Sequence, residues 1–138
     1  MLVTIITIIT IITKKMKLKN NLYTIKSFCK TEAGFDYTLA LNSEHFIYQA
    51  HFPDNPITPG VCIIQIVKEL VTDHLQCELF LKKIHNVKFL NVINPLEFQE
   101  VVFSISILPE EEGTYKVGAV VHYGAQVFAK MSVGFIEK

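Results

Sequence analysis

The residue types best suited to chemistry lie between His51 and Val61, in the order His-Phe-Pro-Asp-Asn-Pro-Ile-Thr-Pro-Gly-Val. Three prolines within seven residues exclude a helix and a central strand, so the segment is predicted to be a rigid loop. The loop ends at Pro59 and Gly60, where an almost wholly apolar segment begins. A rigid loop that carries a histidine and ends at a helix N-terminus can hold a base beside a site for negative charge. This arrangement predicts chemistry next to a carbonyl group.

The same segment resembles the His-Phe-Pro-x-x-Pro-x-x-Pro-Gly-Val signature of the 3-hydroxyacyl-acyl-carrier-protein dehydratases, a family with the hotdog fold. Every fixed position of that signature matches: His51, Phe52, Pro53, Pro56, Pro59, Gly60 and Val61. A weaker likeness extends from about Leu18 to the C-terminus. The resemblance implies an enzyme that acts on an acyl chain carried by acyl carrier protein and that requires neither a metal nor a redox cofactor.

The resemblance also implies roles for the residues of the loop. In that family two subunits form a dimer with the active sites at their interface. His51 stands at the position of the base that removes the proton alpha to the thioester carbonyl, and an acid on the central helix of the other subunit helps the 3-hydroxyl group to leave. Gly60 and Val61 supply the expected N–H donors to the oxyanion, with Phe52 and Pro59 as neighbouring substrate-binding residues. Imidazole accepts a proton near neutral pH, and fixed N–H donors need no reorganisation as charge develops.

The position of the family's acid differs in this chain. It falls six residues after Pro59, where Gln65 stands. A carboxamide donates and accepts hydrogen bonds but cannot protonate a leaving hydroxyl. Glu69 follows one helical turn later, on the same helix face. Glu69 is therefore the candidate acid, with Gln65 orienting substrate or water; alternatively, both residues simply belong to a polar stripe. Ala50 also replaces the family's glycine before the histidine, which indicates a divergent member.

Composition excludes several other classes of function. Of the 138 residues, 50% are hydrophobic and 19% are charged, which indicates a folded domain. The formal net charge is zero, so the sequence predicts no nucleic-acid surface. All thirteen basic residues are lysines, so no arginine can clamp a phosphate through two parallel hydrogen bonds. The cysteines Cys29, Cys62 and Cys77 lack metal-ligand spacing and favour a reduced, cytoplasmic protein with buried thiols.

The first residues form a separate feature. Residues 2–13 carry a Thr-Ile-Ile repeat, followed by Lys14 and Lys15. The apolar run is shorter than the roughly 20 residues that span a bilayer, and its charges follow it, unlike those of a secretory signal. Residues 1–15 are therefore predicted to be a misassigned translation start or a tail outside the fold, with membrane association as the alternative. Residues 16–138 are predicted to form a single domain without a membrane role.

The remaining pattern predicts one helix and six strands. Apolar residues cover most of the circumference of residues 61–75, so this helix must be largely enclosed. Its narrow polar stripe consists of Gln65, Lys68, Glu69, Thr72 and Gln76. The predicted strands are residues 22–28, 35–41, 80–90, 98–108, 115–123 and 126–136. Six strands and one enclosed helix predict an α+β hotdog fold, in which a curved antiparallel sheet wraps around the helix.

Three functions remain open on the sequence. The first is dehydration of a 3-hydroxyacyl thioester on acyl carrier protein to the trans-2-enoyl thioester, in fatty-acid-type or polyene biosynthesis; His51 is then the base, and Glu69 or a water held by Gln65 is the proton source. The second is a hotdog thioesterase, in which Glu69 activates water. The third, favoured by Gln65, is a non-catalytic acyl-carrier-binding subunit that pairs with an active homologue. Each implies at least a dimer, either a homodimer or a heterodimer.

Overall fold

The computed structural model describes residues 17–50 and 54–138. The predicted tail at residues 1–15 lies outside the described residues, as do His51, Phe52 and Pro53. In chain order the elements are β1 (Tyr23–Lys30), β2 (Phe35–Leu41), α2 (Phe46–Ala50), α3 (Gly60–Leu75), β3 (Leu79–Phe89), β4 (Glu100–Pro109), β5 (Thr114–Tyr123) and β6 (Gln126–Glu137). The predicted helix and all six predicted strands are present with slightly shifted ends. The short helix α2 was not predicted.

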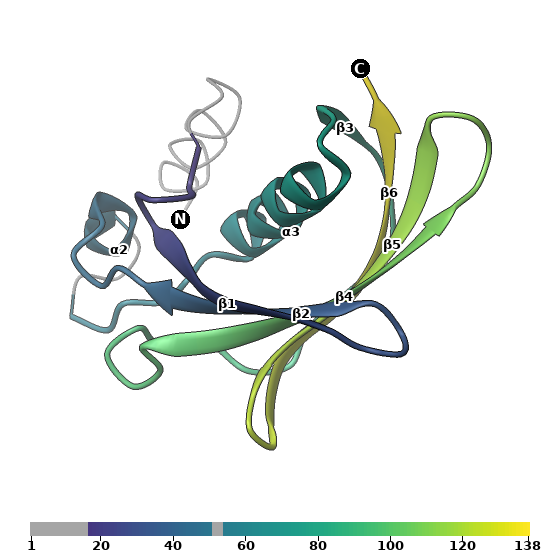
Figure 1. Ribbon diagram of the computed structural model, residues 1–138. Coiled ribbons are helices and arrows are strands. Elements are labelled where there is room, and N and C mark those ends of the chain that lie inside the picture. The colour runs from purple at the N-terminus through teal and green to yellow at the C-terminus, as the bar shows by residue number, and fades with distance from the viewer. Residues whose placement is uncertain (1–16, 51–53) are drawn as a thin grey trace.

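The strands of the described residues form one antiparallel sheet in the order β1-β2-β4-β5-β6-β3. The sheet curves around α3, which lies against its concave side (Figure 1). Strands β2, β4 and β5 alternate buried residues with more exposed ones, because only one face of the sheet packs against the helix. The predicted α+β hotdog fold is confirmed.

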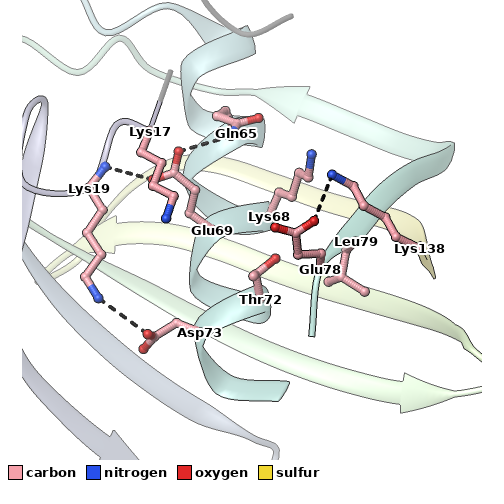
Figure 2. Close-up of a pocket in the computed structure, with 10 residues that line it drawn as sticks. All are labelled: Lys17, Lys19, Gln65, Lys68, Glu69, Thr72, Asp73, Glu78, Leu79 and Lys138. Atoms are coloured by element: carbon pink, nitrogen blue, oxygen red, sulfur yellow. Dashed lines mark hydrogen bonds and ion pairs between the residues drawn. The ribbon is translucent and has the colours of Figure 1, made fainter. Parts of the chain in front are cut away.

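The core lies between this sheet and one side of α3. The buried residues of the helix are all apolar or thiol-bearing: Cys62, Ile63, Ile66, Val67, Leu70 and Val71. They join the inward-facing residues of the sheet in a single hydrophobic cluster, to which Leu18 and Leu22 add from the segment before β1. Enclosure of the helix therefore determines its orientation, and the polar stripe points away from the sheet (Figure 2).

Candidate active site

The N-terminus of α3 offers free backbone donors. Pro59 precedes the helix in an extended conformation, and within the described residues no side chain caps this end. The Pro59 carbonyl oxygen accepts hydrogen bonds from the N–H groups of Cys62 and Ile63, at 3.0 and 3.1 Å. Among the described residues, no group accepts a hydrogen bond from the N–H of Gly60 or of Val61. Two free N–H groups at the positive end of a helix suit a carbonyl oxygen on which negative charge develops.

The loop before this helix end is fastened to the rest of the molecule by Thr58. Its N–H and Oγ1 both donate to the carbonyl oxygen of Ile93, at 2.9 and 3.2 Å. The Tyr48 hydroxyl of α2 lies 2.9 Å from Thr58 Oγ1, and both side chains are buried. Burial raises the pKa of Tyr48 to about 12, so its hydroxyl stays neutral. Packed elements therefore hold both flanks of residues 51–53.

His45, the other histidine near the loop, has a structural role. Its Nδ1 accepts a hydrogen bond of 3.1 Å from the N–H of Ile47, at the start of α2. Its ring stacks on Phe46 with the centroids 4.6 Å apart. Burial lowers the pKa of His45, which favours the neutral ring that this hydrogen bond needs. The predicted base, His51, lies outside the described residues, and its role stays a prediction, as does the role of Phe52.

Glu69 accepts four hydrogen bonds. Its Oε1 accepts from the Lys19 N–H at 2.8 Å and from the Tyr23 hydroxyl at 3.0 Å. Its Oε2 accepts from the Leu18 N–H at 2.9 Å and from Gln65 Nε2 at 3.0 Å. Figure 2 shows the carboxylate between the N-terminal segment and the helix. Because a carboxylate offers about four lone-pair sites, this arrangement leaves none for a substrate hydroxyl.

The carboxylate therefore fastens the segment before β1 to α3. The adjoining side chains of Leu18 and Leu22 are fully buried, and Lys19 Nζ also lies 3.4 Å from Asp73 Oδ1. Burial, followed by the charge of Glu69, raises the pKa of Tyr23 far above its usual range, so its hydroxyl remains a donor. The sequence predicted that Gln65 and Glu69 share a helix face, and they do. It missed the other three donors because they come from a segment about fifty residues away.

Most of the polar stripe of α3 lines a pocket of about 290 Å³. Its lining residues are Lys17, Lys19, Gln65, Lys68, Glu69, Thr72, Asp73, Glu78, Leu79 and Lys138 (Figure 2). Gly60 and Val61 do not line it; Gln65 lies five residues further along the helix, which is about 7.5 Å of axial rise. The predicted site residues thus form two groups, the free N–H groups at the helix start and the Gln65–Glu69 pair on its side.

The cysteines have no catalytic arrangement. Cys62 is buried on α3, and burial followed by the charge of Glu69 raises the pKa of its thiol to about 12. A thiol with so high a pKa is not a nucleophile at neutral pH. The expectation of buried thiols is right for Cys62 alone, because Cys29 is exposed and Cys77 partly exposed.

Among residues 17–50 and 54–138, no His, Cys, Asp or Glu side chains form a group that could hold a metal ion. In these ranges no helix is long and apolar enough to cross a membrane.

The strand order and the enclosed helix are those of the hotdog fold (Figure 1). The family model of the ApeI-like proteins, described as ApeI dehydratase, matches residues 27–130. The chain therefore belongs to the ApeI-like dehydratase family.

Solved structures with the same fold are distant in sequence. The dehydratase heterocomplex ApeI:P from Xenorhabdus doucetiae matches with a TM-score of 0.62 at 17% identity, over 83% of this chain and 97% of that chain. A Bacillus halodurans protein in complex with CoA matches with a TM-score of 0.54 at 12% identity, over 81% and 73%. A proposed thioesterase from Silicibacter matches with a TM-score of 0.58 at 11% identity, over 94% and 88%. These likenesses establish the fold alone. No curated protein matches the chain.

The four hydrogen bonds of Glu69 predict a large loss of stability on its removal. Glu69→Ala leaves the Leu18 and Lys19 N–H groups and the Tyr23 hydroxyl without their acceptor, and we expect it to lower the free energy of unfolding by about 3 kcal/mol. Tyr23→Phe removes one donor and costs about 1 kcal/mol. Urea unfolding followed by circular dichroism measures both. Asp73→Ala, which breaks the partly exposed ion pair between Asp73 of α3 and Lys19, is the control and costs at most about 1 kcal/mol. Equal losses for Glu69→Ala and Asp73→Ala would contradict this account.

Proposed function

We propose that this chain dehydrates a 3-hydroxyacyl thioester on acyl carrier protein to the trans-2-enoyl thioester, as a step of fatty-acid-type or polyene biosynthesis in the cytoplasm. The observation that carries the proposal is the free N-terminus of α3, with its unused N–H groups at Gly60 and Val61, directly after the His-Phe-Pro loop. Membership of the ApeI-like dehydratase family supports the same reaction class.

The reaction begins at the thioester carbonyl. Its oxygen accepts hydrogen bonds from the N–H groups of Gly60 and Val61, which stabilise the enolate-like charge that develops when C2 loses a proton. The imidazole of His51 takes that proton. The electron pair of the C2–H bond forms the C2–C3 double bond, and the C3–O bond breaks. The departing hydroxyl must gain a proton to leave as water.

Gln65 of the second subunit in the proposed dimer, with a bound water, is the proposed route for that proton, because within one chain Gln65 lies on the side of α3, apart from the N–H groups of Gly60 and Val61. Its Nε2 donates to Glu69, so its carbonyl oxygen is free to accept from a water beside the substrate hydroxyl. The proton that His51 removes from C2 is returned through this water to the departing hydroxyl, and the substrate loses one molecule of water overall. Glu69 was the first candidate acid, but its four acceptor sites are occupied, so we assign it the orientation of Gln65.

A second candidate is a non-catalytic acyl-carrier-binding subunit of a heterodimer. The carboxamide of Gln65 at the acid position and the occupied carboxylate of Glu69 both favour it. The ApeI:P structure, which has the same fold, is a heterocomplex. A thioesterase ranks lower, because it needs a carboxylate with a free oxygen to activate water, and Glu69 has none in this arrangement.

The edge strand β3 is the proposed partner surface. On one side β3 pairs with β6, and in the described part of the chain no strand pairs with its other side. Leu81 and Ile84 are 43% and 48% exposed, although they pair with Phe135 and Val133, which face the core. An edge strand with exposed apolar side chains and open backbone groups is suited to continue its sheet into a second subunit. We expect that subunit to be a second copy of this chain or a homologous hotdog chain.

Dehydration is tested with the full chain and 3-hydroxyhexanoyl thioester on acyl carrier protein, followed by enoyl absorbance and mass. We expect the enoyl product, and a loss of at least about 10²-fold in turnover for His51→Ala. We expect Glu69→Gln, in correctly folded form, to retain turnover. Loss of all turnover in folded Glu69→Gln would make Glu69 the acid. Release of free acid and thiol would identify a thioesterase, and carrier binding without any product would identify the binding subunit.

The oligomeric state tests the role of β3. Sedimentation velocity at micromolar concentration should give a dimer. Ile84→Lys should shift it towards the monomer, because a charge would be buried without a partner at the interface. Leu108→Lys is the matched control, since Leu108 is 60% exposed but lies at the end of β4. A monomeric wild-type chain, or equal behaviour of the two variants, would contradict the proposed surface.

A further inference from the structure

We infer that Phe89 is a specificity-determining residue, whose ring limits the size of the substituent at C2 of the acyl group. The inference rests on the proposed function, because it takes the start of α3 as the site of the thioester carbonyl. It arises from a close contact between Phe89 and Gly60 that neither the loop signature nor the polar stripe explains.

The ring of Phe89 lies directly against the first residue of α3. A Cβ atom at residue 60 would lie 2.6 Å from Cζ of Phe89 and 2.9 Å from Cε2. Gly60 does not have the positive φ that favours glycine, which in the described residues Gly113 and Gly124 adopt. Space, and not backbone conformation, therefore favours glycine at residue 60, because the tip of the Phe89 ring lies where a Cβ atom would be.

Phe89 is not a core residue. It ends β3 opposite the buried Ala129, so it faces the concave side of the sheet. Its side chain nevertheless remains 52% exposed, and Val61, the residue after Gly60, is 37% exposed. A half-exposed aromatic ring against Gly60 forms a wall beside the start of α3. Through Phe89, the end of β3 contacts the helix end at which the carbonyl is proposed to bind.

The geometry of a bound thioester brings C2 within reach of this wall. A carbonyl oxygen that accepts from the Gly60 N–H lies about 2.9 Å from the nitrogen, and its carbon lies about 1.2 Å further on. C2 is the next atom along, whereas the distal end of the acyl chain is many bonds away. The ring of Phe89 should therefore discriminate against a methyl group at C2 while having little effect on chain length.

The test compares 3-hydroxyhexanoyl and 2-methyl-3-hydroxyhexanoyl thioesters on the carrier. We expect Phe89→Ala to raise kcat/KM for the branched substrate, relative to the unbranched one, by about tenfold or more, the usual size of discrimination by one carbon. Phe80→Ala is the matched control, because Phe80 lies on the same strand and is 53% exposed, but packs beneath Lys138. An unchanged ratio in Phe89→Ala, or an equal change in Phe80→Ala, would overturn the inference.

A double-mutant cycle separates the contact from a direct need for glycine. The Cβ of Gly60→Ala must displace the ring, so this variant should lose turnover, and Gly60→Ala combined with Phe89→Ala should recover it. A double variant as inactive as Gly60→Ala would show that glycine serves the substrate and would overturn the inference. If the wild-type chain dehydrates neither substrate, the proposed function fails. The role of Phe89 is then decided by binding. The ratio of the dissociation constants of the branched and unbranched acyl-pantetheine amides is compared between the wild type and Phe89→Ala.

Discussion

Burial of α3 in the concave side of the sheet is the constraint on which the rest of the structure depends. The six inward-facing residues of the helix, spread between Cys62 and Val71, lie in the core. Each large apolar side chain among them contributes about 1.5–3 kcal/mol when fully buried. This burial sets the rotation of the helix about its axis. Two parts of α3 then remain available for chemistry, the N-terminal N–H groups and the polar stripe.

The two parts of the helix have different uses. Gly60 and Val61 keep free donors at the positive end of the helix, where a carbonyl oxygen gains most from them. Glu69 uses its carboxylate to hold the chain before β1, and through one oxygen it holds the amide of Gln65. The carboxylate that looks available for catalysis in the sequence is thus the most heavily hydrogen-bonded group of the stripe. Through this hydrogen bond Glu69 holds the Gln65 side chain in a fixed position on the helix.

Prediction from the sequence succeeded where a regular pattern decides the structure. Alternation along the strands and the nearly complete apolar surface of residues 61–75 predicted the sheet, the helix and the hotdog fold. The five-residue helix α2 was not predicted, because little more than one helical turn leaves no periodic signal in the sequence. The order of strands in the sheet put β3 at an edge, which the strand pattern alone does not encode.

The candidate site was predictable in part. The proline loop and the residues Pro59 and Gly60 predicted where the helix begins and that its N–H groups are available. The bonds of Glu69 to Leu18, Lys19 and Tyr23 were not predictable, because two of the three donors are backbone N–H groups whose position depends on tertiary packing. The contact of Phe89 with Gly60 also depends on tertiary packing, because it joins two elements far apart in the chain, and so it was not predictable either.

The most direct measurement of the central claim is an amide titration by nitrogen-15 NMR. The full chain is titrated with a hydrolysis-resistant 3-hydroxyhexanoyl-pantetheine amide, whose carbonyl stands in for that of the thioester. We expect the amide protons of Gly60 and Val61 to move downfield on binding, as those of new hydrogen-bond donors do. Those of Leu18 and Lys19 should keep their shifts, because Glu69 still accepts their hydrogen bonds. Binding that leaves the Gly60 and Val61 signals in place and moves those of Leu18 and Lys19 would contradict it.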